Sequence, residues 1–277
     1  MNLFATTLPA LAAVAALIFT WISVAQVSDE LTISEQGQIA DRYDTAVEKL
    51  VDDSMDVRRG AIYSMQSIMT DSPRMQPAVI DMLSKYIRDR ATKNLKTTEK
   101  SPDIQAALYA LGNRNPSHDG NAVIDLRGAH LKEAKLEGMN LANADLTEAV
   151  VSGANAEKAV LSGARLERAV LHGTQLTGAD LSQADASKAD LKSAVLAGAD
   201  LTHAHVEQAD LRGADLTGAD LSGVDMAGAN LEGAYLAEVT WNDTNLAGAR
   251  RPEGDLPDDL PSSTTRPPRS QATNASP

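Results

Sequence analysis

From Ile124 to Ala249 the chain places an apolar residue at every fifth position. The centres of these units run from Leu126 to Leu246, which makes twenty-five consecutive units in one register, usually with Ala two positions before the centre. Neither the 3.6-residue period of a helix nor the two-residue period of a strand divides five, so no single straight element keeps these centres on one face. The chain must turn once per unit, which predicts a solenoid whose coils bury their apolar faces against one another.

Units such as 199–203 (ADLTH) and 214–218 (ADLTG) resemble the A(D/N)LxX consensus of the pentapeptide-repeat family. The resemblance implies a mainly β fold, a right-handed quadrilateral parallel β-helix over residues 121–250, with four units per coil and about six coils stacked at ~4.8 Å. Two centres are Ala156 and Ala186 where the family usually has Leu or Phe, so we expect a looser interior at those levels.

Between residues 36 and 112 the apolar period changes to that of helices. Apolar stripes at three- and four-residue spacing lie in 39–50, 57–69, 79–87 and 104–111, and Ser101-Pro102 is expected to start the last helix with Ser as N-cap. These stripes predict a small all-α segment, residues 31–115, arranged as a bundle or a HEAT-like stack that covers the N-terminal end of the solenoid.

The first 28 residues carry no charged side chain, and residues 8–27 are almost wholly apolar, long enough to cross a ~30 Å hydrocarbon core. We therefore expect one transmembrane helix in an N-terminal anchor, residues 1–30. The alternative is a cleaved signal peptide ending at Ser23-Val24-Ala25, but the basic n-region is missing and the apolar stretch is too long.

Few basic residues flank the anchor, so charge does not fix its orientation. The order of hydrophobic N-terminus, helical linker (with DVRRGAIY at 56–63 and DSPR at 71–74) and repeats resembles the bacterial membrane-anchored pentapeptide-repeat proteins. Many proteins of that type have a second spanning segment, whereas this sequence has only one apolar stretch of that length, so we expect a single-pass membrane protein. The resemblance implies a cytoplasmic body. The final residues, 251–277, are rich in Pro, Ser and Thr and are predicted to form a disordered tail.

The composition of the chain excludes several kinds of site and partner. The absence of Cys excludes disulfides, thiolate metal sites and cysteine nucleophiles, and a net charge of −13 argues against a nucleic-acid partner. No phosphate loop and no Ser-His-Asp set is recognisable, so we expect no catalysis and no cofactor. His203 and His205 lack an evident third ligand, and we interpret them as a solvated surface pair rather than a metal site.

The acidity is concentrated in residues 179–249, which contain 12 Asp and Glu against 3 Lys and Arg. With four units per coil, residues twenty apart stack, which predicts like-charged columns whose members raise one another's pKa values and could form an interaction face. The alternative is that each Asp binds backbone amides of its own turn. The columns are Asp180, Asp200 and Asp220 on one face, and Asp190 and Asp210 on another.

Tyr235 and Trp241 are the only aromatic residues of the repeat region and lie in its last units. Capping the last coil is one interpretation, since terminal repeats are usually atypical. The other is a homodimer through the C-terminal coil, which resembles the pairing of gyrase-interacting pentapeptide proteins.

Two functions remain open from the sequence. The first is a membrane-tethered scaffold that presents a rigid acidic β-helix to a protein partner. The second is a DNA mimic that modulates a type II topoisomerase, gyrase, as the resemblance to fluoroquinolone-resistance pentapeptide proteins implies. Fold-level analogy alone is a weak argument for the second.

Overall fold

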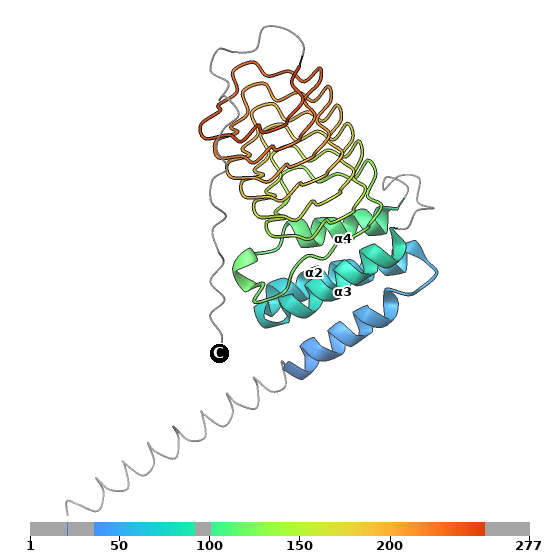
Figure 1. The fold of residues 1–277 in the computed structure, drawn as a ribbon. Helices are drawn as coiled ribbons and strands as arrows, with labels where there is room; N and C mark the ends of the chain where they lie inside the picture. The colour runs from blue at the N-terminus through green and yellow to red at the C-terminus, as the bar shows by residue number, and fades with distance from the viewer. Residues whose placement is uncertain (1–20, 22–35, 92–100, 253–277) are drawn as a thin grey trace, which may run out of the picture.

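The computed structural model describes Trp21 and residues 36–91 and 101–252. A layer of helices lies at one end, and a stack of coils rises from it (Figure 1). Apart from Trp21, the predicted membrane span of residues 8–27 lies outside the described residues, as does most of the predicted tail. Among the described residues, no helix combines the length and the apolar character that crossing a bilayer requires.

The helical layer follows the predicted apolar stripes. Residues 36–49 are helical, and the buried side chains of the later helices include Ile62, Ile80 and Leu108 from three different stripes. Ser101 occupies the N-cap position and Pro102 the first turn of the last helix as expected, although the Ser101 side chain makes no capping hydrogen bond. The elements are α2 (Met55–Asp71), η1 (Pro73–Met75), α3 (Gln76–Arg90), α4 (Pro102–Gly112) and η3 (Pro116–His118).

A buried charge network ties three of these helices together. Asp103 of α4 accepts hydrogen bonds from Arg58 Nε of α2 at 2.8 Å and from the Tyr86 hydroxyl of α3 at 2.6 Å. Arg58 also donates to the carbonyl oxygens of Asp52 and Asp53, so its guanidinium is hydrogen-bonded to a carboxylate, a hydroxyl and two backbone carbonyl groups. Burial and the bond to Asp103 raise the pKa of Tyr86 to about 12. Burial acts to raise the pKa of Asp103, but the hydrogen bonds from Tyr86 and Arg58 outweigh it and lower that pKa overall.

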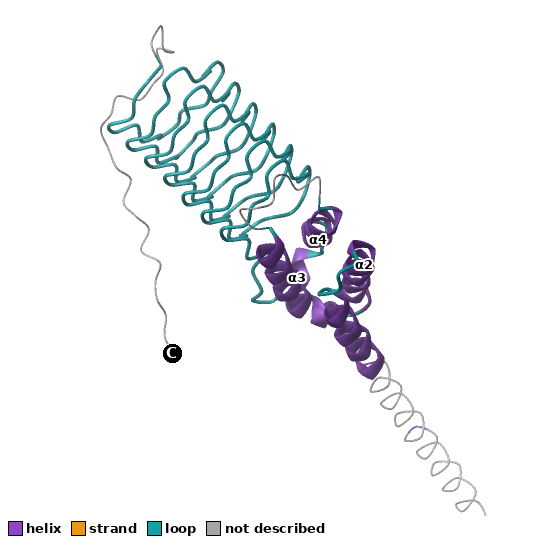
Figure 2. Cartoon of the chain, turned by 90° about the vertical axis from the view of Figure 1, so that its right-hand side faces the viewer, coloured by secondary structure: helices purple, strands orange, loops and turns teal. Residues whose placement is uncertain are grey.

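The coil confirms the twenty-residue register. In each unit one residue forms a parallel backbone bridge with the residue twenty positions later, from Asp125↔Asp145 to Asn230↔Arg250, so four units form one coil. The bridges are isolated single-residue pairs, and Figure 2 accordingly draws the coil without strand arrows. The expectation of a mainly β fold is thus met in its pairing pattern but not in the form of extended strands within the described residues.

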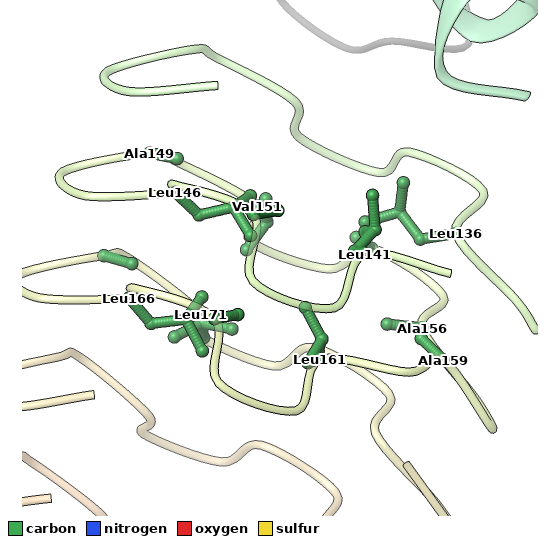
Figure 3. Close-up of a cluster of buried hydrophobic side chains, with 14 of the residues drawn as sticks. Leu136, Leu141, Leu146, Ala149, Val151, Ala156, Ala159, Leu161, Leu166 and Leu171 are labelled. Carbon is green, nitrogen blue, oxygen red and sulfur yellow. The ribbon is translucent and has the colours of Figure 1, made fainter. Parts of the chain in front are cut away.

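The coil interior is dry and filled by the predicted centres. Figure 3 shows Leu136, Leu141, Leu146 and their neighbours pointing into the space between the walls, and these side chains are at most 4% exposed. A small apolar cavity of about 10 Å³ lies beside Ala156. That volume is far below what a small-molecule ligand needs, so the missing Leu loosens the packing without creating a pocket.

Each unit turns at its fifth residue, which has positive φ in every unit. Twelve of these residues are not glycine; His203 (φ 58°) and Lys188 (φ 62°) are examples. Left-handed backbone costs a non-glycine residue roughly 1–2 kcal/mol, and the pairing between coils must compensate for it. The His203 ring lies over Gly223 of the next coil, where an added Cβ would meet the imidazole. A Cβ at Gly218 would meet nothing.

The helical layer supplies the backbone partners that the first coil lacks. Asn140 N–H donates to the carbonyl of Gly112, the last residue of α4, at 2.8 Å, and His130 N–H donates to the carbonyl of Ala91 after α3 at 2.8 Å. On the other two faces the acceptors are side chains, Gln105 Oε1 for Lys135 N–H at 3.0 Å and Ser84 Oγ for Asp125 N–H at 3.3 Å. One N–H group on each of the four faces is therefore paired with the helices.

The buried network predicts acid sensitivity. Because the pKa of Asp103 is lower in the folded state, its contribution to stability is present above the pKa of an unfolded Asp, ~3.9, and is lost as the pH falls through the folded value. Replacing Asp103→Asn should cost about 3–5 kcal/mol at pH 7 because Arg58 is left as an uncompensated buried charge. Urea melts between pH 7 and pH 3 should show the gap between wild type and variant narrowing at the acidic end. A gap independent of pH would contradict the network.

The turn geometry predicts a difference between two glycines. Gly218→Ala should lower stability by about 1 kcal/mol through backbone strain alone. Gly223→Ala should cost about 1 kcal/mol more, because its Cβ must displace the His203 ring. Thermal melts of both variants, repeated with His203→Ala, test the contact: the excess cost at Gly223 should vanish without the imidazole.

Candidate functional site

The predicted acidic column is in register. Asp180 pairs with Asp200, and Asp200 with Asp220, as parallel bridge partners. The Oδ1 atom of each carboxylate accepts a hydrogen bond from the N–H of the residue two positions later. Asp180 accepts from Ser182 at 3.0 Å, Asp200 from Thr202 at 2.8 Å, and Asp220 in the same way from Ser222. The turn-stabilising interpretation therefore holds for these residues. It leaves the second oxygen free, and within the described part of the chain no Lys or Arg forms an ion pair with any of the three.

The second predicted column is different because it is neutralised. Lys192 Nζ lies 3.0 Å from Asp190 and 3.4 Å from Asp210, and Arg212 donates two hydrogen bonds to Asp210. The hydrogen bond from Arg212 lowers the pKa of Asp210 to about 2. The expected mutual rise of pKa is therefore wrong for Asp210. The cations were visible in the sequence, but the twenty-residue step that places Lys192 between two Asp residues decides their effect.

We define the acidic face as Asp180, Asp200 and Asp220 together with the residues that follow them at the corner, Ser182, Thr202 and Ser222. The corner residues are short and polar, and their side chains or N–H groups bind the neighbouring carboxylates. Negative charge on this face is consequently carried by rigid, short side chains at a repeat of ~4.8 Å.

The two histidines separate in the structure. His203 lies at a corner over Gly223, whereas His205 projects from the next face, where its bridge partners are Asp185 and Asp225. His205 Nδ1 is 3.5 Å from Glu207 Oε1. One ligand atom each from His205, Glu207 and Asp225 lie within 4.8 Å of one another. Sequence reasoning missed this cluster because it sought a third ligand near the His-x-His pair; the signal was the residue twenty positions beyond His205.

The two C-terminal aromatic residues occupy different places. Trp241 is 7% exposed at an interior centre of the last coil, where capping would require it, and its buried Nε1 has no hydrogen-bond partner among the described residues. Tyr235 is 66% exposed and is paired through its backbone with Asp215. The homodimer through this end of the coil stays a prediction.

Two clefts lie where the helices meet the coil, with volumes of about 260 and 350 Å³. Arg114 lines both, and its guanidinium is held by Asp119 at 2.6 and 2.9 Å. The first cleft is otherwise lined mainly by amide and apolar side chains with His118, and the second by residues 119–124 and the first coil. The positive charge of Arg114, which lines both clefts, is thus compensated within the protein.

The acidic face predicts opposite effects for two substitutions at Asp200. Asp200→Asn keeps the turn bond, as Asn140 and Asn230 do in equivalent slots, and removes like-charge repulsion, so stability should rise by about 0.2–1 kcal/mol at low salt. Asp200→Ala should lose about 0.5–1.5 kcal/mol with the hydrogen bond. Urea melts at low and high ionic strength measure both. Equal effects of the two variants would contradict the assignment.

Comparison with known proteins identifies the family to which the repeat region is similar. A family model described as pentapeptide repeats matches residues 124–163, 157–192 and 194–233. No curated protein matches the sequence.

Solved structures are similar over the repeats. HetL, a pentapeptide repeat protein involved in heterocyst differentiation regulation in Nostoc sp. strain PCC 7120, is 35% identical; the match covers 49% of this chain and 67% of HetL, with a TM-score of 0.20. A second pentapeptide repeat protein from Nostoc PCC 7120 is 32% identical over 37% of this chain and 77% of its own, with a TM-score of 0.23. QnrB1, a plasmid-mediated fluoroquinolone resistance protein, is 17% identical over 47% of this chain and 78% of its own, with a TM-score of 0.36.

Proposed function

This chain belongs to the pentapeptide-repeat family, and we propose that it is a membrane-tethered scaffold whose acidic face binds a protein partner near the bilayer. The observation that carries the proposal is the uncompensated column Asp180, Asp200 and Asp220, whose carboxylates point outward from a rigid wall. Such a column favours a partner with a row of Lys or Arg, because opposite charges steer association and fix its register.

The arrangement of the chain supports the tether. The helix of residues 36–49, with which the continuous described chain begins, lies on the far side of the helical layer from the coil in both views (Figures 1 and 2). An anchor in residues 8–27 would enter from that side and would hold the coil and its acidic face beside the bilayer. The helix of residues 36–49 is fastened to the layer by Arg42, which bonds to Asp71 and Ser67, and by Tyr43, whose hydroxyl donates to the Ala78 carbonyl.

The absence of a recognisable catalytic set in the sequence and the filled coil interior support a role in binding rather than catalysis. The cavity beside Ala156 is about 10 Å³, and the two junction clefts present a compensated guanidinium. Neither feature offers the apolar pocket with convergent polar groups that small-molecule sites have.

The test is recovery of a partner from native membranes. The full-length chain carrying Asp180→Asn, Asp200→Asn and Asp220→Asn together keeps every turn bond but loses three charges, and it should recover at least about tenfold less of the wild-type partner after crosslinking, since several charge-assisted contacts are lost. The matched control is Asp190→Asn with Asp210→Asn, which alters carboxylates that Lys192 and Arg212 already neutralise. It should recover the partner at nearly wild-type yield. Equal yields from both variants would refute the acidic face.

A DNA-mimic role in modulating gyrase is the second candidate, and the same column favours it because DNA-binding surfaces are basic. Lys192 and Arg212 neutralise Asp190 and Asp210 and so interrupt the negative charge around the coil. An interrupted negative surface suits a protein partner better than a basic site that binds both strands of a DNA duplex. A supercoiling assay with the full-length chain separates the two. Inhibition that disappears in the variant with Asp180, Asp200 and Asp220 changed to Asn would replace the scaffold by the mimic.

A further inference from the structure

On a different face of the coil from Asp180, Asp200 and Asp220, we infer that His205, Glu207 and Asp225 bind one divalent first-row transition metal ion of the zinc class. One imidazole nitrogen of His205 and one carboxylate oxygen from each acid lie within 4.8 Å of one another. Ligands of a tetrahedral ion with bonds of ~2.0–2.2 Å are ~3.4 Å apart, so small side-chain rotations suffice to close the site.

The carboxylates are already oriented by neighbours that are not ligands. Ser187 Oγ donates to Glu207 Oε2 at 2.9 Å, which leaves Oε1 on the side of the imidazole. Asp225 Oδ1 accepts the N–H of Ala227 at 3.0 Å and Asn245 Nδ2 at 2.9 Å. Its Oδ2 has no hydrogen-bond or ion-pair partner among the described residues. Such outer contacts fix ligand oxygens in metal sites.

The donor set points to the class of ion. One imidazole nitrogen with two carboxylate oxygens suits Zn²⁺, Co²⁺ or Ni²⁺, whereas Ca²⁺ and Mg²⁺ prefer oxygen ligands alone. The imidazole is what distinguishes this cluster from the column Asp180, Asp200 and Asp220, which offers only oxygen. Waters would complete the coordination, because the His205 side chain is 54% exposed.

Charge favours the same ion. Glu207 and Asp225, with Asp185 as the other bridge partner of His205, form no ion pair with Lys or Arg in the part of the chain that is described. A divalent cation would compensate carboxylates that the protein leaves uncompensated. It would also join two coils, since Asp225 follows His205 by one full turn of twenty residues.

The experiment is a titration of the full-length chain with Co²⁺ and then Zn²⁺, in mild detergent and chelator-free buffer, after purification through a tag without histidine. Wild type should take up one equivalent of Co²⁺ with visible d–d absorption that Zn²⁺ abolishes. His205→Ala and Asp225→Asn should each weaken binding at least about tenfold. Zn²⁺ should raise the melting temperature of wild type but not of His205→Ala, because only an ion bound to the folded state stabilises it.

Two controls make the result specific. His203→Ala removes a histidine two residues away that lies over Gly223, and Asp200→Asn removes a carboxylate without an imidazole neighbour; both should bind Co²⁺ like wild type. Circular dichroism in the presence of EDTA checks that every variant is folded. Absence of saturable uptake by wild type overturns the inference, as does a loss in His203→Ala equal to that in His205→Ala.

Discussion

Backbone pairing between residues twenty apart is the constraint from which the rest of the coil follows. In a unit inside the coil three N–H groups bond to neighbouring coils. Leu201 and His203 N–H donate to the carbonyls of Asp220 and Ser222 of the next coil at 2.9 Å each, and Asp200 N–H donates back to Ala179 at 3.0 Å. Such bonding on both sides fixes the register, and a slip by one residue would turn every Leu outward. The dry interior, the acidic face and the His205 cluster therefore all follow from the same twenty-residue register.

The two ends of the coil differ in how their backbone and side-chain polar groups are paired. Helices finish with carbonyl groups that lack partners, and the first coil begins with N–H groups that lack partners. Gly112 and Ala91 bring these two deficits together, and Gln105 adds a side chain that both accepts from and donates to Lys135. At the other end Trp241 covers the interior with its Nε1 unsatisfied. The helical layer is thus a template for the coil rather than a separate domain placed beside it.

Much of the coil could be predicted because its information is local and repeated. Leu201 and its equivalents are recognisable at a five-residue step, and the family resemblance supplied the four-unit coil. Contacts outside the repeat could not be predicted in this way. The bond from Gln105 to the first coil and the pairing of Arg58 with Asp103 depend on how the helices pack, which no period encodes. His205 was singled out, but its partner Asp225 emerges only when the twenty-residue step is applied to every outward side chain.

The contact between the helix ends and the first coil also sets the order in which the coils form during synthesis. A nascent chain leaves the ribosome N-terminus first, so α4 and its terminal carbonyl at Gly112 exist before residue 140 has been synthesised. Each later turn then finds a finished edge to add to, as in crystal growth on a seed. Because the coil grows from one end, each new turn pairs in the register that the previous turn already fixes. Only the edge of the last turn is exposed at any moment.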